Sequence, residues 1–123
     1  MKNEFIKNGD ILFFNSKGLK RFLKGFNRTQ TAIFLIIEGQ SCVSYFDGKK
    51  VIIQNFFTFS RDFNYISASP NWIKNPLKDV FIRLGWTGYS NTDQFIGELL
   101  GAKDHINFKG GSCLNYCISN GWL

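Results

Sequence analysis

The chain has 123 residues, of which 44% are hydrophobic and 17% aromatic, including 14 phenylalanines. This length is typical of one domain, and this composition supports a dense core and argues against disorder. We therefore expect residues 1–123 to form a single domain. The formal charge of +6 favours anionic partners such as cell-wall polymers, lipid headgroups or acidic protein surfaces, or else serves solubility alone.

Several function classes receive no support from the sequence. Three cysteines and one histidine indicate neither a disulfide framework nor a metal site, and the absence of a glycine-rich phosphate loop argues against a nucleotide cofactor. Nucleic-acid binding would rest on charge alone, so no specific nucleic acid is expected. No apolar run reaches the roughly 18 residues of a membrane span, and no signal peptide is evident. We expect a cytoplasmic or virion-associated protein without cofactors or a transmembrane segment.

The first elements of the chain are predicted to be a strand, a helix and a second strand. Residues 10–14 form a short apolar run typical of a buried strand. Apolar residues then recur at helical spacing over residues 16–26, with Ser16 as a candidate N-cap. The other faces of this helix are basic, which indicates either a solvated surface or a docking face for an anionic partner. Residues 31–37 read as a central strand covered on both faces.

A hairpin is expected next. Residues 41–46 and 50–56 are interpreted as two strands that flank Asp47 and Gly48. This dipeptide favours a tight type I′ turn because glycine accepts positive φ. The hairpin predicts antiparallel pairing in a small sheet.

The middle of the chain gives weaker signals. Two prolines interrupt residues 57–78, so we expect a loop around one short strand at residues 64–68. Residues 79–84 are a short segment rich in apolar side chains and are interpreted as a further strand.

Two helices are predicted at the end of the chain. Residues 92–100 follow a capping cluster and carry apolar side chains on one face. The last helix begins at Ser112, a candidate cap, and ends before Gly121. The order of strand, helix, several strands and two helices predicts an α+β fold.

Cys113 lies in the first turn of the last predicted helix. The helix N-terminus favours thiolate over thiol there, which makes Cys113 a candidate nucleophile. A free cysteine can equally be a buried packing residue. Cys42 and Cys117 are interpreted as packing residues.

The order of elements resembles a known superfamily. Gly9, Asp10 and Ile11 open the first strand, residues 29–33 open the second, and Ser112 with Cys113 opens the last helix. This order is similar to that of the circularly permuted papain-like cysteine hydrolases of the NlpC and lecithin:retinol acyltransferase type. The resemblance covers residues 9–121 and implies a small antiparallel sheet with packed helices.

The resemblance also implies roles for single residues. Cys113 matches the nucleophile, and Gln30 stands where these enzymes have their histidine base. The third polar group falls on Ser44 or Tyr45. A carboxamide cannot accept the thiol proton, so Gln30 points to an inactive or impaired site, and changing it to histidine would be expected to restore activity. We expect Cys113 and Gln30 at the edge of one cleft.

His105 is the one histidine of the chain and therefore the one candidate for a substitute base. It would have to reach Cys113 from a loop, with Asp104 or Glu38 orienting its ring. The alternative is a surface loop histidine without a catalytic role.

Two functions follow from these observations. The first is a degenerate cysteine-hydrolase fold that serves as a binding or structural module, with protein partners in a virion or secreted assembly or an anionic cell-wall or lipid ligand. The second is an active thiol hydrolase or acyltransferase that cleaves a cell-wall peptide, an amide or an ester through Cys113. The missing histidine favours the binding module.

Overall fold

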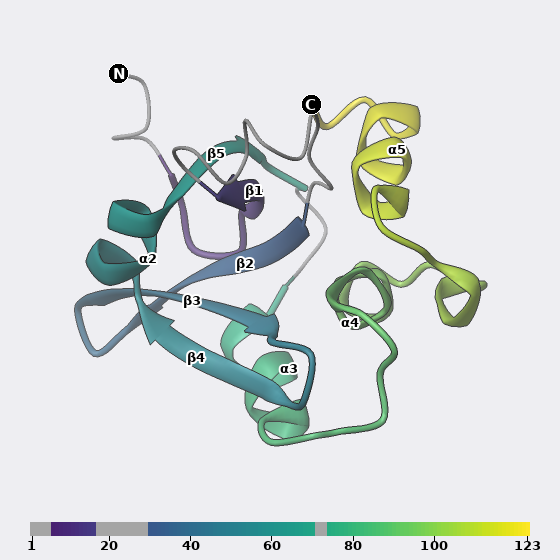
Figure 1. Cartoon of the computed structure of the whole chain (residues 1–123). Coiled ribbons are helices and arrows are strands. Elements are labelled where there is room, and N and C mark those ends of the chain that lie inside the picture. The colour runs from purple at the N-terminus through teal and green to yellow at the C-terminus, as the bar shows by residue number, and fades with distance from the viewer. Residues whose placement is uncertain (1–5, 17–29, 71–73) are drawn as a thin grey trace.

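The computed structural model describes residues 6–16, 30–70 and 74–123. Within them the strands are β1 (Ile11–Ser16), β2 (Gln30–Ile37), β3 (Gln40–Phe46), β4 (Val51–Asn55) and β5 (Phe63–Ala68). The helices are α2 (Phe56–Asp62), α3 (Pro76–Arg83), α4 (Thr92–Leu99) and α5 (Ser112–Ser119), with a short 3₁₀ helix, η2 (His105–Asn107) (Figure 1). The chain is thus α+β, as the sequence predicts.

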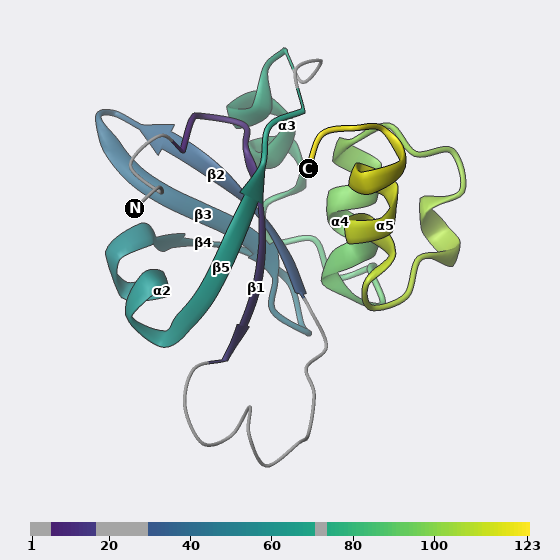
Figure 2. The same cartoon turned by 90° about the horizontal axis from the view of Figure 1, so that it is seen from above.

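The described strands form one five-stranded sheet in the order β4-β3-β2-β1-β5. Every neighbouring pair is antiparallel, which confirms the expected antiparallel pairing. Figure 2 shows α2 on one face of the sheet and α4 with α5 on the other. The sheet is therefore covered on both faces.

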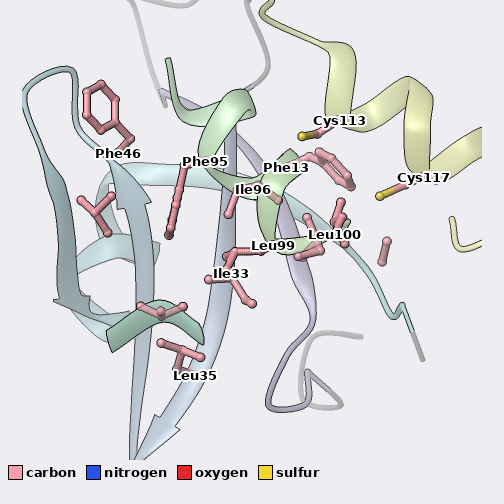
Figure 3. Close-up of a cluster of buried hydrophobic side chains, with 14 residues drawn as sticks. Phe13, Ile33, Leu35, Phe46, Phe95, Ile96, Leu99, Leu100, Cys113 and Cys117 are labelled. Atoms are coloured by element: carbon pink, nitrogen blue, oxygen red, sulfur yellow. The ribbon is translucent and has the colours of Figure 1, made fainter. Parts of the chain in front are cut away.

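Alternation along the strands divides the buried side chains into two clusters. In β1, Ile11 and Phe13 join the cluster under α4 and α5, while Leu12 and Phe14 join the cluster under α2. Successive strand residues point to opposite faces, so a continuous apolar run fills both clusters. Figure 3 shows the larger cluster, with Cys113 and Cys117 extending into it from α5.

The turns of the two hairpins are of different lengths. Glu38 and Gly39 have φ values of 51° and 82° and join residues that pair directly, which is the two-residue arrangement of a type I′ turn. The loop at Asp47 is longer, because Phe46 pairs with Val51. The Asp47 carboxylate instead accepts hydrogen bonds from the Lys49 and Lys50 backbone N–H groups at 2.8 and 3.0 Å. The predicted hairpin is confirmed, and the predicted type I′ turn at Asp47 is wrong.

The strand predicted over residues 79–84 is also wrong, because this segment lies in α3. Pro76 occupies the first turn of the helix, and the Asn75 side chain accepts a hydrogen bond from the Lys78 N–H. Proline at the start and a capping asparagine before it are strong helix-start signals. They prevail over the local apolar pattern, and Val80 is the buried residue of this segment.

The remaining predictions have mixed outcomes. A strand near residues 64–68 is confirmed as β5, whereas α2 replaces part of the expected loop and begins after Asn55, whose side chain caps it. The predicted helices over residues 92–100 and after Ser112 are confirmed as α4 and α5. The helix predicted over residues 16–26 lies outside the described residues from residue 17 on. No described helix is long and apolar enough to cross a membrane.

Candidate functional site

Cys113 is the second residue of α5 and is fully buried. Its thiol donates a hydrogen bond to the backbone carbonyl of Asp93 at a sulfur-to-oxygen distance of 3.2 Å. Gly111 is the N-cap of the helix and has no side chain to offer, so the candidate cap Ser112 is instead the first helical residue. The Ser112 hydroxyl accepts a hydrogen bond from the Lys109 N–H at 2.9 Å.

The environment of Cys113 opposes ionisation. Burial raises the pKa of its thiol well above the usual range, and the nearby carboxylate of Asp93 raises this pKa further. The sequence-based expectation that the helix N-terminus favours thiolate is therefore wrong. A dipole effect of about 1 kcal/mol is outweighed by removal of the sulfur from water and by a neighbouring negative charge.

The Asp93 carboxylate, and not a thiolate, occupies the N-terminus of α5. One carboxylate oxygen accepts from the Cys113 backbone N–H at 3.0 Å, and the other accepts from the Thr31 hydroxyl at 2.9 Å. The side chain is almost completely buried, and this burial raises the pKa of Asp93 despite its hydrogen bonds. Asp93 thus acts as a tertiary cap of α5, joining α5 to β2 and α4.

Thr92 extends the same network to the next strand. Its hydroxyl donates to the Thr31 carbonyl at 2.8 Å and accepts from the Phe46 N–H at 3.1 Å. The Asn91 side chain caps α4 by accepting from the Gln94 N–H. Three consecutive residues before and within α4 therefore fix its N-terminus against β2, β3 and α5.

Gln30 lies outside this network. It is exposed and pairs with Phe14 across β1, and Phe14 belongs to the cluster under α2. Directly paired residues of an antiparallel ladder share a face, so the Gln30 side chain leaves the sheet on the face opposite to that of Thr31. Thr31, and not Gln30, is therefore the β2 residue that is linked to Cys113, through the Asp93 carboxylate.

The two candidates for the third polar group are also engaged elsewhere. The Ser44 hydroxyl donates to the Ile52 carbonyl at 2.7 Å across the hairpin. The Tyr45 hydroxyl donates to the Gln54 side chain at 2.8 Å, and its ring packs on Phe14 in the cluster under α2. Neither hydroxyl forms a hydrogen bond with Cys113.

His105 is half-buried in η2. Its Nδ1 lies 3.0 Å from the Ala102 carbonyl oxygen, and its ring lines a groove together with Tyr89 and Glu98. No hydrogen bond joins His105 to Cys113. Asp104 and Glu38, the candidates for orienting the ring, are exposed, and no hydrogen bond joins either side chain to His105 within the described residues.

The other two cysteines differ in exposure. Cys117 is fully buried beside Cys113 in the larger cluster, and burial raises the pKa of its thiol to about 11. Cys42 is half-buried, with its sulfur 3.7 Å from the Gln40 carbonyl oxygen. The structure places Cys117 in the core, as expected, and leaves Cys42 partly accessible.

A cleft of about 440 Å³ lies beside the first residues of α4 and the loop before α5. Its lining combines polar and apolar groups, and the residues are Gln30, Phe46, Asp47, Gly48, Ser90, Asn91, Thr92, Asp93, Lys109 and Gly110. Cys113 is not among the lining residues. The cleft offers hydrogen-bonding groups to a ligand, but no thiol.

Asp93 is the main residue of this region that sequence reasoning missed. An aspartate in the first turn of a helix ordinarily faces solvent and interacts with the helix dipole, so its type and position carried no signal of burial. Among the described residues, no group of three His, Cys, Asp or Glu side chains is arranged to hold a metal ion. The site is therefore a hydrogen-bonded junction of three elements around a neutral thiol.

Comparison with known proteins assigns no family to this arrangement. The chain matches no family model, no curated protein and no solved structure.

Proposed function

We propose that the chain is a non-catalytic binding or structural module with the architecture of a circularly permuted papain-like cysteine hydrolase. The observation that carries this proposal is the state of Cys113, which is fully buried and donates its thiol proton to a backbone carbonyl. A nucleophile has to meet its substrate, and this thiol is covered.

The groups around the thiol support the proposal as well. A thiol nucleophile needs a neighbour that accepts its proton and later returns it to the leaving group. The Cys113 thiol donates its hydrogen bond to the Asp93 backbone carbonyl, which cannot act as a base. The Asp93 carboxylate already accepts from Thr31 and from the Cys113 backbone.

The arrangement of elements supports the architectural part of the proposal. A helix with cysteine near its N-terminus packs on an antiparallel sheet whose first described strand follows Gly9 and Asp10. This order is the one that carries the resemblance to the permuted papain-like hydrolases. Gln30, in the place of the base, opens β2.

Hydrolysis of an activated ester and of an acyl thioester tests the proposal. We expect wild type, Cys113→Ala and His105→Ala to give rates within about twofold of one another, since an acid–base group contributes roughly 100-fold or more. Cys117→Ala is the matched control, because it removes another buried thiol from the same face of α5. Turnover by wild type that Cys113→Ala abolishes and Cys117→Ala retains would establish an active thiol hydrolase instead.

A further inference from the structure

A second hollow of the surface lies away from Cys113, between α3, α4 and η2. This groove, hereafter the α3–η2 groove, has a volume of about 460 Å³. Its apolar wall consists of Ile82, Trp86 and Ile106. Its polar side groups are Arg83, Tyr89, Glu98 and His105. Ligand sites typically combine apolar walls with a few convergent polar groups, as this groove does.

The apolar wall is unusually open to solvent. Trp86 is 56% exposed, and Ile82 and Ile106 are each 67% exposed. Isolated exposed apolar side chains are common, but several that line one hollow mark a contact surface. Trp86 contributes the largest flat surface among them.

Gly88 fixes the position of Trp86. A Cβ atom added to Gly88 would lie 2.7 Å from the Trp86 indole, so only glycine lets the backbone pack this closely on the ring. Trp86 also meets Tyr89 edge to face, with ring centroids 6.5 Å apart. The indole therefore packs on the Gly88 backbone and on the Tyr89 ring beside the groove.

The polar side is centred on Glu98. One of its carboxylate oxygens accepts from Arg83 Nε at 3.2 Å and also from the Tyr89 hydroxyl. Within the described residues the other oxygen takes no hydrogen bond. Arg83 uses two of its N–H groups, one on Glu98 and one on the Asp79 carbonyl, and keeps donors for a ligand.

His105 completes the polar side, and a second close approach positions it. A Cβ atom on Gly97 would lie 2.7 Å from the Phe108 ring and 3.0 Å from the His105 Cβ, so glycine allows η2 to pack directly on α4. The Nδ1 atom lies 3.0 Å from the Ala102 carbonyl oxygen, which leaves Nε2 of the ring for a ligand. The groove thus offers both donors and acceptors.

The charges of the groove select the class of ligand. The Arg83 guanidinium and the Glu98 carboxylate form an ion pair and neutralise each other, so the groove gives no net attraction to an ionic ligand. A matching ligand is neutral, has one apolar face for the indole and carries hydroxyls that both donate and accept. Pyranose sugars have this shape, since their axial C–H groups form a face that aromatic rings attract.

We propose that the α3–η2 groove binds a neutral saccharide, stacked on Trp86 and hydrogen-bonded to Glu98, Arg83 and His105. This inference deepens the proposed binding function by naming a site and a ligand class. It does not involve Cys113, so the two proposals can fail separately.

Calorimetric titration of the intact chain with cellotetraose, maltotetraose and N-acetylchitotetraose tests the inference. We expect at least one of these sugars to bind saturably at concentrations up to about 10 mM. Trp86→Ala should weaken binding at least tenfold, as loss of a central aromatic contact generally does. Gly88→Ala should weaken it as well, because the added methyl group displaces the indole.

Phe57→Ala is the matched control, because Phe57 is an aromatic side chain 72% exposed on α2, on the other face of the sheet. Binding that Phe57→Ala retains and Trp86→Ala loses supports the inference. Absence of saturable binding to all three sugars overturns it, as does binding that Trp86→Ala leaves unchanged. Selective binding of an apolar peptide at Trp86 without any sugar binding would also overturn it and identify a peptide groove. In each case the ester hydrolysis of the same preparations tests the non-catalytic assignment independently.

Discussion

Asp93 and Cys113 hold each other in a reciprocal pair of hydrogen bonds. The Asp93 carboxylate accepts from the Cys113 backbone N–H at 3.0 Å, and the Cys113 thiol donates to the Asp93 carbonyl at 3.2 Å. The N-terminus of α5 therefore stabilises a carboxylate rather than a thiolate. This relationship keeps the sulfur neutral and buried.

The first prediction concerns the stability of this junction. Asp93→Ala removes the acceptor of two buried donors, the Cys113 N–H and the Thr31 hydroxyl. Unsatisfied buried donors cost about 1–3 kcal/mol each, so we expect a loss of about 2–6 kcal/mol in the free energy of unfolding, measured by urea denaturation.

Asp93→Asn is the conservative control for the same site. Its carbonyl oxygen can accept from the Cys113 N–H while its amide donates to the Thr31 hydroxyl, whose proton can rotate away. We expect a change of no more than about 1 kcal/mol. Equal destabilisation by alanine and asparagine would mean that the hydrogen bonds of Asp93 are not what stabilises the junction.

The second prediction is a pH dependence of stability. Because burial raises the pKa of Asp93 above its ordinary value of 3.8, the folded state retains this proton at pH values where the unfolded state has released it. The contribution of Asp93 to stability is therefore greatest below pH 3.8 and falls as the pH rises through the raised pKa.

The difference in unfolding free energy between wild type and Asp93→Asn isolates this effect from other groups. Glu98 and Asp47 act in the opposite direction, since hydrogen bonds lower the pKa of both carboxylates, but both occur in wild type and variant. We expect the free energy of unfolding of wild type minus that of Asp93→Asn to decrease from acid to neutral pH, as followed by urea denaturation across that range. A difference that increases over the same range would mean that the pKa of Asp93 is lowered by folding.

The third prediction concerns Gln30→His. The resemblance to cysteine hydrolases implies that this change restores a base, which would raise hydrolysis about 100-fold or more. The register of β1 and β2 instead directs the side chain of residue 30 to the face opposite to Thr31. We therefore expect hydrolysis of an activated ester within about twofold of wild type. A large gain that also requires Cys113 would show that residue 30 reaches the thiol.

Much of the fold could be predicted from the sequence. The apolar run at residues 31–37 is a strong local pattern and appears as β2. The two predicted strands around Asp47 appear as β3 and β4. The segment at residues 79–84 was wrongly predicted to be a strand because a short run rich in apolar residues fits a strand as well as a helix. The capping signals at Asn75 and Pro76, just before it, carried the correct information.

The site was less predictable, because its decisive contacts are tertiary. The position of Cys113 near a helix N-terminus could be read from the sequence, but its burial could not. This burial is the main cause of its raised pKa. Asp93 raises the pKa further, but it lies 20 residues away in the sequence, and its own burial follows from the packing of α4 on β2. The α3–η2 groove depends on close approaches at Gly88 and Gly97, which no sequence pattern marks.

Site-resolved alkylation by iodoacetamide, followed by mass spectrometry of the folded chain, tests the central claim most directly. Thiolate character and access set the rate. Burial raises the thiol pKa of all three cysteines, but only Cys42 is partly accessible, so we expect it to react on the order of 100-fold faster than the fully buried Cys113 or Cys117. In denaturing urea the three rates should converge. If Cys113 is instead the fastest of the three in the folded chain, it is an accessible, activated thiol, and the non-catalytic assignment is wrong.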